Sequence, residues 1–162
     1  MNRTKTSFIE HRIQALATVF LTGRNNVETY SLNMEDGPDL LARVISPEDD
    51  FEMFFGVILT GTSEELSTGA QAAAYLNAWF EGHDGKLIRR RPFPVIALIF
   101  SMQRDDGFYA WLDEPIVEAT SLPGLRSHSQ IECSRANRHG LDRIVNQIRL
   151  WYKAFYEAVR SS

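Results

Sequence analysis

Carboxylates gather in one short stretch of this chain, beside a Gly-Pro pair. They belong to Glu35, Asp36 and Asp39, and the apolar run 40–45 follows directly. Carboxylates at the point where a strand leaves a turn can hold a hard divalent cation such as Mg²⁺. Asp36 and Asp39 are therefore candidate metal ligands. The alternative is purely conformational, because Asp and Gly are common in turns, and Asp39 then starts its strand in solvent.

Other residues that carry chemistry are sparse. Cys133 is the single cysteine, which excludes an internal disulfide and fits a reducing compartment. The four histidines are scattered without zinc-ligand spacing, so each is interpreted as a surface or partly buried side chain. The basic cluster Arg89, Arg90 and Arg91 is either a solvated strand edge or a contact for nucleic-acid phosphate, to which arginine is well suited.

Length and composition indicate one domain spanning 1–162, with a C-terminal helical extension from residue 140 onward. Hydrophobic residues make up 44% of the chain and charged residues 23%, a balance typical of globular proteins. The net charge of −4 gives no basic footprint, so weak or no nucleic-acid binding is expected. The N-terminus lacks the apolar segment of a signal peptide, and the longest apolar run, 95–100, is too short to cross a bilayer. We therefore expect a cytoplasmic protein without a membrane partner.

Hydrophobic periodicity places the acidic stretch at the start of the second strand of a sheet. Ile9, Ile13, Leu16 and Phe20 form one stripe of an amphipathic helix, and the apolar run 95–100 is typical of a central strand covered on both faces. In order, the sequence predicts a helix around 9–20, strands at 27–32, 39–45 and 52–60, a helix at 69–81, strands at 95–100 and 108–112, and a helix at 141–160. Within 115–140 it predicts only one short strand, near Ile131. The fold class is α/β, a mixed central sheet with an αβββαβ core flanked by helices, plus a C-terminal helix.

This order of elements and the residues of the acidic hairpin together resemble the PD-(D/E)XK, restriction-endonuclease-like fold. The likeness is to a bacterial branch of uncharacterised domains with a helical Glu, an Asp-x-Gly-x-Asp strand start and a Gln-x-Lys pair on the next strand. Glu10 matches the helical position, and Glu35-Asp36-Gly37-Pro38-Asp39 matches the strand start. The likeness covers the chain from Thr6 to Glu114.

The resemblance also indicates which positions should carry the metal ligands and the catalytic lysine. At two of these positions the chain departs from the family. In such nucleases the strand-start acid and a polar residue on the next strand bind Mg²⁺, while a lysine two residues on stabilises developing negative charge. The matching positions here are Asp39, Ile58 and Thr60. Ile58 cannot ligate a cation and Thr60 carries no charge. The resemblance therefore implies a vestigial site of Glu10, Asp39, Ile58 and Thr60, with no catalytic residue and no cofactor.

Two functional hypotheses follow from the acidic hairpin. The first is a catalytically degenerate nuclease-like domain, not an enzyme, that serves as a protein-interaction or regulatory module. The resemblance sets such a module in a bacterial defence or mobile-element context. The alternative is an active Mg²⁺-dependent nuclease with a rearranged site made of Glu10, Asp36 and Asp39, and only then is Mg²⁺ a cofactor.

The C-terminal helix gives a third hypothesis, a structural homodimer subunit. Trp151, Tyr152, Phe155 and Tyr156 occupy adjacent positions around the helix. They cover more of its circumference than a single core-facing stripe needs. We expect part of this surface to meet a protein partner, which includes a second copy of the chain.

Overall fold

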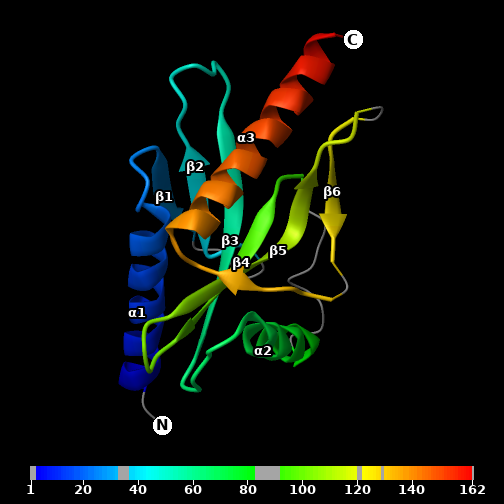
Figure 1. Cartoon of the computed structure of the whole chain (residues 1–162). Coiled ribbons are helices and arrows are strands. Elements are labelled where there is room, and N and C mark those ends of the chain that lie inside the picture. The colour runs from blue at the N-terminus through cyan, green and yellow to red at the C-terminus, as the bar shows by residue number, and fades with distance from the viewer. Residues whose placement is uncertain (1–2, 33–36, 83–91, 120–121, 129, 162) are drawn as a thin grey trace.

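The computed structural model of the chain describes residues 3–32, 37–82, 92–119, 122–128 and 130–161. Within these ranges, three helices surround a seven-stranded mixed sheet that is mostly antiparallel (Figure 1). The helices are α1 (Arg3–Leu21), α2 (Gly69–Gly82) and α3 (Arg138–Arg160). The strands are β1 (Val27–Ser31), β2 (Leu40–Val44), β3 (Met53–Thr62), β4 (Val95–Ser101), β5 (Gly107–Ile116), β6 (Gly124–Ser127) and β7 (Ser134–Arg135). The α/β class predicted from the sequence is confirmed.

The first six elements form the predicted αβββαβ core. β1, β2 and β3 are neighbours in an antiparallel meander, in which Leu40 of β2 lies opposite Val57 of β3. α2 then crosses over, so that β4 pairs with β3 in parallel and Val57 lies opposite Ile96. β5 returns from β4 as its antiparallel hairpin partner. β6 and β7 both pair with the outer edge of β5, so they close that side of the sheet.

The helices cover the two faces of the sheet unequally. α1 and α3 lie on one face, where their side chains join Leu40, Phe55 and Ile96 in the larger core (Figure 1). α2 covers the other face, where Leu76 packs with Ile58 in a smaller core. Each strand of the centre therefore has an apolar layer above it and another below it.

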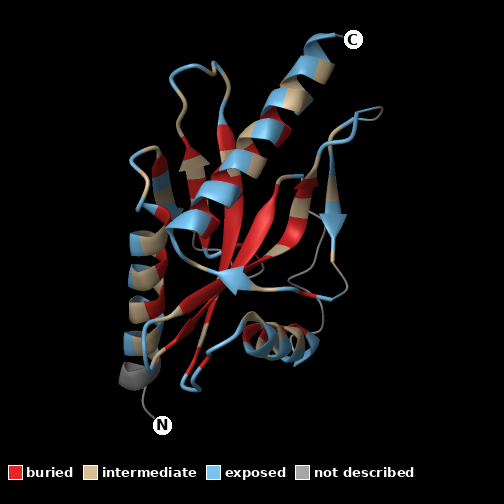
Figure 2. Cartoon of the chain, viewed as in Figure 1, coloured by how far each residue is buried: buried red, intermediate tan, exposed pale blue. Residues whose placement is uncertain are grey.

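β4 is the strand that both layers bury. All seven of its residues are buried, and Figure 2 shows the burial concentrated in the central strands. A strand that is covered on both faces carries apolar side chains on both, so apolar and polar residues do not alternate along it. The continuous apolar run 95–100 predicts a central strand covered on both faces, and the burial of β4 confirms this prediction.

The region 115–140 differs from the prediction. The sequence predicts one short strand near Ile131, whereas the structure places β6 at Gly124–Ser127 and β7 at Ser134–Arg135. All four β6 residues are exposed or only partly buried, so the apolar alternation that marks a half-buried strand is missing. Ile131 itself lies between the two strands and fills the smaller core beside α2.

The helix boundaries differ by a few residues. α1 begins at Arg3, earlier than the helix around 9–20 that the sequence predicts. α3 begins at Arg138, where the side chain of Asn137 caps it by accepting the N–H of Gly140 at 2.8 Å. Among the helices that the structure describes, none combines the length and apolar character needed to span a bilayer.

Candidate functional site

Asp39 lies at the head of β2, where three hydrogen bonds hold it. Its backbone N–H donates to the carbonyl of Val57 at 2.9 Å, and its own carbonyl accepts the N–H of Leu32, also at 2.9 Å. Its carboxylate Oδ2 accepts the N–H of Leu59 at 2.7 Å. The β2–β3 ladder ends at the pair of Leu40 with Val57, so this carboxylate satisfies a backbone donor just beyond the ladder.

Glu10 of α1 is brought into electrostatic range of Asp39. The pKa of Asp39 is raised from 3.8, first because packing removes water from its carboxyl group and, more weakly, because the Glu10 charge repels its ionised form. The hydrogen bond from Leu59 acts in the opposite direction. The structure thus brings together the two carboxylates that the sequence could only place on separate elements.

Ile58 and Thr60 add no ligand to this carboxylate pair. Ile58 follows Val57, so extension of the register places it opposite Asp39 on β3. Its side chain is 2% exposed and belongs to the core beneath α2. Thr60 is also buried, at 8% exposure, and its neutral hydroxyl cannot replace a lysine ammonium.

The remaining predicted site residues lie outside the described residues. These are Asp36 of the acidic hairpin and the basic cluster Arg89, Arg90 and Arg91. Within the described ranges, no group of three His, Cys, Asp or Glu side chains is placed to hold a metal ion. Glu10, Asp39, Ile58 and Thr60 are therefore the described part of the predicted site, and only the first two carry carboxylates.

A second site, which the sequence did not reveal, is a polar cavity of about 350 Å³ beside β5. We call it the polar pocket. One wall is α3, with Arg143, Asn146 and Gln147. The rest is formed by β5, by the chain between β6 and β7, and by the start of β7, which contribute Tyr109, Ala110, Trp111, Glu114, His128, Glu132 and Ser134.

The path of the chain at the sheet edge opens this cavity. β6 pairs with residues 113–116 of β5, and β7 pairs with Phe108 and Tyr109, so residues 110–112 pair with neither strand. On this stretch of β5, Trp111 contacts Gln147 of α3. Gly140 lets α3 start close to β5, because a Cβ there would come within 2.9 Å of the Tyr109 ring and 2.5 Å of the Arg135 carbonyl.

Two side-chain contacts shape the polar pocket. His128 Nε2 lies 2.5 Å from Glu114 Oε2, and this pair links the end of β6 to β5. The indole N–H of Trp111 donates to Oε1 of Gln147 at 3.3 Å, which links β5 to α3. Sequence reasoning missed the site because its residues come from three separate segments, and only the 143, 146, 147 spacing on one helix face hints at it.

No known family model and no curated protein matches this chain. A functional interpretation must therefore come from the geometry of the carboxylate pair, of the polar pocket and of the other polar clusters.

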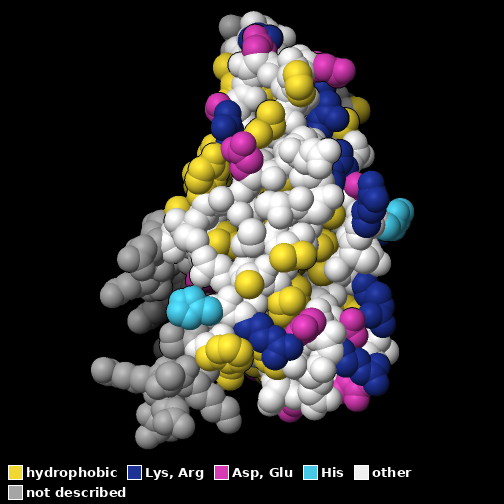
Figure 3. All heavy atoms as spheres, turned by 90° about the vertical axis from the view of Figure 1, so that its left-hand side faces the viewer, with side chains coloured by type: hydrophobic (Ala, Val, Ile, Leu, Met, Phe, Trp, Pro, Cys, Tyr) yellow, Lys and Arg dark blue, Asp and Glu magenta, His cyan; other side chains and the backbone are white. Residues whose placement is uncertain are grey.

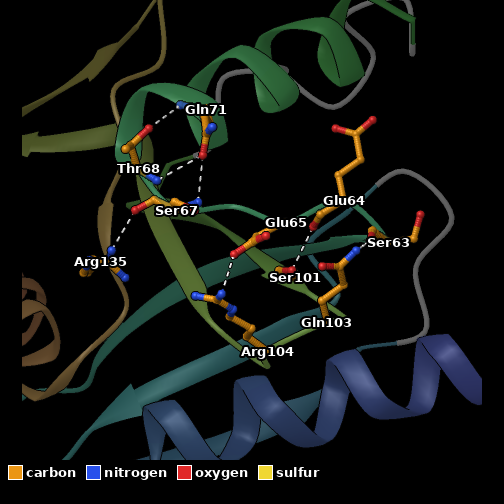
Figure 4. Close-up of polar contacts among 10 residues, drawn as sticks. All are labelled: Ser63, Glu64, Glu65, Ser67, Thr68, Gln71, Ser101, Gln103, Arg104 and Arg135. Carbon is orange, nitrogen blue, oxygen red and sulfur yellow. Dashed lines mark hydrogen bonds and ion pairs between the residues drawn. The ribbon is translucent and has the colours of Figure 1, made fainter.

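A third polar cluster, at the carboxyl ends of β3 and β4, serves structure. Ligands often bind at the carboxyl ends of parallel strands in open sheets. Figure 4 shows that here the polar groups contact one another: Ser101 Oγ donates to the Glu64 carbonyl at 2.8 Å, and Arg104 pairs with Glu65 at 2.8 Å. Arg135 adds a hydrogen bond to the Ser67 carbonyl at 2.7 Å. These contacts hold the 63–68 loop in place.

Proposed function

We propose that this chain is a catalytically degenerate nuclease-like domain that acts as an interaction or regulatory module. Two features support the nuclease-like part: the αβββαβ order with β4 parallel to β3, and an acid, Asp39, at the head of β2. The resemblance to the PD-(D/E)XK fold remains part of the proposal, as do the cytoplasmic location and the bacterial defence or mobile-element context.

The burial of Ile58 is the observation that carries the loss of catalysis. Mg²⁺ needs several oxygen ligands in near-octahedral geometry. The β3 position opposite Asp39 instead holds an apolar side chain that is 2% exposed. Loss of one preorganised charge-stabilising group costs about 10²–10³ in rate, and a lost metal ligand adds to that. The Asp39 carboxylate, moreover, already accepts the N–H of Leu59.

The test is incubation of the purified chain with single- and double-stranded DNA and RNA in Mg²⁺ or Mn²⁺. We expect no cleavage above that of a matched Asp39→Asn variant, which preserves the size of the side chain and removes its charge. Cleavage by the natural chain that disappears in Asp39→Asn and in Glu10→Gln would overturn the proposal.

That outcome would establish the alternative, an active Mg²⁺-dependent nuclease with a rearranged site. The specific observation in its favour is that the charge of Glu10 contributes to the raised pKa of Asp39, because two carboxylates that repel each other are relieved by a shared cation. Asp36, the third residue of that site, lies outside the described residues.

A basic surface for nucleic acid would also favour the alternative. On the face that carries α1, Figure 3 shows acidic and basic side chains interspersed among the described residues. Ion pairs account for part of this mixture: Arg12 of α1 pairs with Asp105, and Arg43 of β2 pairs with Glu52 at 2.7 Å. This arrangement supports a module that binds protein over one that binds nucleic acid.

The partner that we propose is a protein, which includes a second copy of this chain. Trp151 and Tyr152 are buried within their own chain, where the Tyr152 hydroxyl donates to the Phe54 carbonyl at 2.6 Å. Tyr156 stacks on Phe51. The width of the aromatic face of α3 therefore has an explanation inside the domain, and Phe155, 40% exposed, is the most exposed of its four aromatic side chains.

A further inference from the structure

We propose that the polar pocket binds a small zwitterionic molecule, of the size of an amino acid or a dipeptide. The pocket shares no residue with the carboxylate pair of Glu10 and Asp39. Ligand binding there is therefore independent of whether the chain cleaves nucleic acid, and either proposal can fail without the other.

The α3 wall of the pocket presents hydrogen-bond donors. Arg143, Asn146 and Gln147 lie on one face of the helix at positions i, i+3 and i+4. The Oε1 atom of Gln147 accepts the indole N–H of Trp111, so its amide NH₂ group is turned away from that ring. A guanidinium beside amide N–H groups suits a carboxylate, because charged and neutral donors then converge on its two oxygens.

The part of the lining outside α3 presents acceptors. Glu114 from β5 and Glu132 from the chain between β6 and β7 both reach the cavity. Glu114 is held in place by His128, at 2.5 Å. Two carboxylates suit an ammonium group, which has three donors to share between them.

Two of the charges that line the cavity are left unneutralised by the chain itself, whereas Glu114 pairs with His128. Within the described residues, Arg143 and Glu132 form no ion pair with each other or with any other side chain. A simple anion such as phosphate would gain Arg143 but face two carboxylates, and a simple cation would face Arg143. A ligand that carries one positive and one negative charge can pair with Arg143 and with the carboxylates at once. The pocket should therefore prefer it to a simple anion or cation.

The volume and the floor of the cavity set the size of the ligand. At about 350 Å³ the space lies at the lower end of the range for small-molecule sites, about 300–1,000 Å³. Tyr109 and Trp111 supply aromatic surface for an aliphatic part of the ligand. An amino acid or a dipeptide fits these limits.

The indole N–H of Trp111 provides a direct spectroscopic reporter. The chain has three tryptophans, and neither Trp79 nor Trp151 lines the pocket, so their indole signals serve as internal references. A ¹H–¹⁵N spectrum of the natural chain, with Trp111→Phe for assignment, would be titrated with glycine, L-leucine, L-glutamine and glycyl-L-leucine. We expect at least one of these to shift the Trp111 signal saturably. N-acetyl-L-leucinamide, which lacks both charges, should bind at least about tenfold more weakly.

Variants separate recognition of the two charges. Arg143→Gln and Glu132→Gln should each weaken the zwitterion that binds by about tenfold or more, since each removes one charge-assisted contact. Arg138→Gln, on the same helix outside the pocket, and Glu48→Gln are the matched controls and should leave binding unchanged. The proposal is overturned if no zwitterion shifts Trp111 at about 10 mM. Equal binding of the blocked amide or of inorganic phosphate would overturn it as well.

Discussion

At the scale of single residues, Asp39 combines a structural task with an electrostatic cost. Its Oδ2 satisfies the N–H of Leu59, a contact that a neutral oxygen could make as well. Its negative charge is opposed by lost hydration and by Glu10. Because the folded pKa lies above the ordinary value of 3.8, ionisation of Asp39 as pH rises past that value lowers the free energy of unfolding.

Two substitutions at Asp39 separate these contributions. Asp39→Asn keeps an acceptor for Leu59 and cannot ionise, so at pH 7 its free energy of unfolding should equal or exceed that of the natural chain. The difference should shrink as pH falls toward 3.8. Asp39→Ala leaves the Leu59 N–H without that acceptor and should cost about 1–3 kcal/mol. Urea melts at several pH values measure both effects, and equal destabilisation by Asn and Ala would show that the charge itself stabilises the fold.

At the scale of elements, β4 holds the two layers together. Ile96 faces the core beneath α1 and α3, while Ala97 faces the core beneath α2, and both are fully buried. The neighbouring strand β3 also packs closely against α1. Gly61 permits this approach, because a Cβ on Gly61 would come within 2.5 Å of the Ile13 side chain. Close packing on both faces leaves little room for relaxation around a cavity in β4.

Ile96→Ala should therefore lower the free energy of unfolding by about 2–5 kcal/mol. Leu150→Ala on α3 is the matched control, since that side chain is 54% exposed and its loss should cost less than about 0.5 kcal/mol. Denaturant melts compare the two. A loss below about 0.5 kcal/mol in Ile96→Ala would mean that β4 is not the interior strand.

At the scale of the whole molecule, α3 ties the αβββαβ core to the strands added after it. Tyr152 donates its hydroxyl to the Phe54 carbonyl on β3, while the indole N–H of Trp151 donates to the Gly124 carbonyl on β6 at 2.8 Å. Consecutive residues of one helix thus contact β3, in the middle of the sheet order, and β6, at its edge. The same helix lines the polar pocket with Arg143, Asn146 and Gln147.

Trp151→Phe removes the donor to β6 but keeps an aromatic ring in place. We expect a loss of about 1 kcal/mol in the free energy of unfolding and faster amide hydrogen exchange in residues 124–127. Tyr152→Phe, next to it in the helix, should have a similar cost with exchange in 124–127 unchanged. The same increase in exchange for both variants would show that the Trp151 contact does not anchor β6.

Much of the architecture was predictable because local chemistry and global position agree. The 3.6-residue stripe of α1, the apolar run of β4 and the polar turn before β5 each have one favourable structure. β6 was missed because most of its side chains are in contact with water, so its existence depends on pairing with β5 and on Trp151. The burial of Trp151 and Tyr152 within the chain is not predictable from the sequence, because the segments that they contact lie far away in it.

The sequence by itself determined the α/β class, the αβββαβ order and the position of Asp39 at the head of a strand. All three depend on periodicity and turn chemistry within a few residues. Only the tertiary structure decided that Glu10 acts on Asp39, that Ile58 is sealed beneath α2, and that Arg143 and Glu132 line one cavity. The physical reason is that burial and charge pairing depend on distances between segments, and a linear pattern does not contain those distances until the chain has folded.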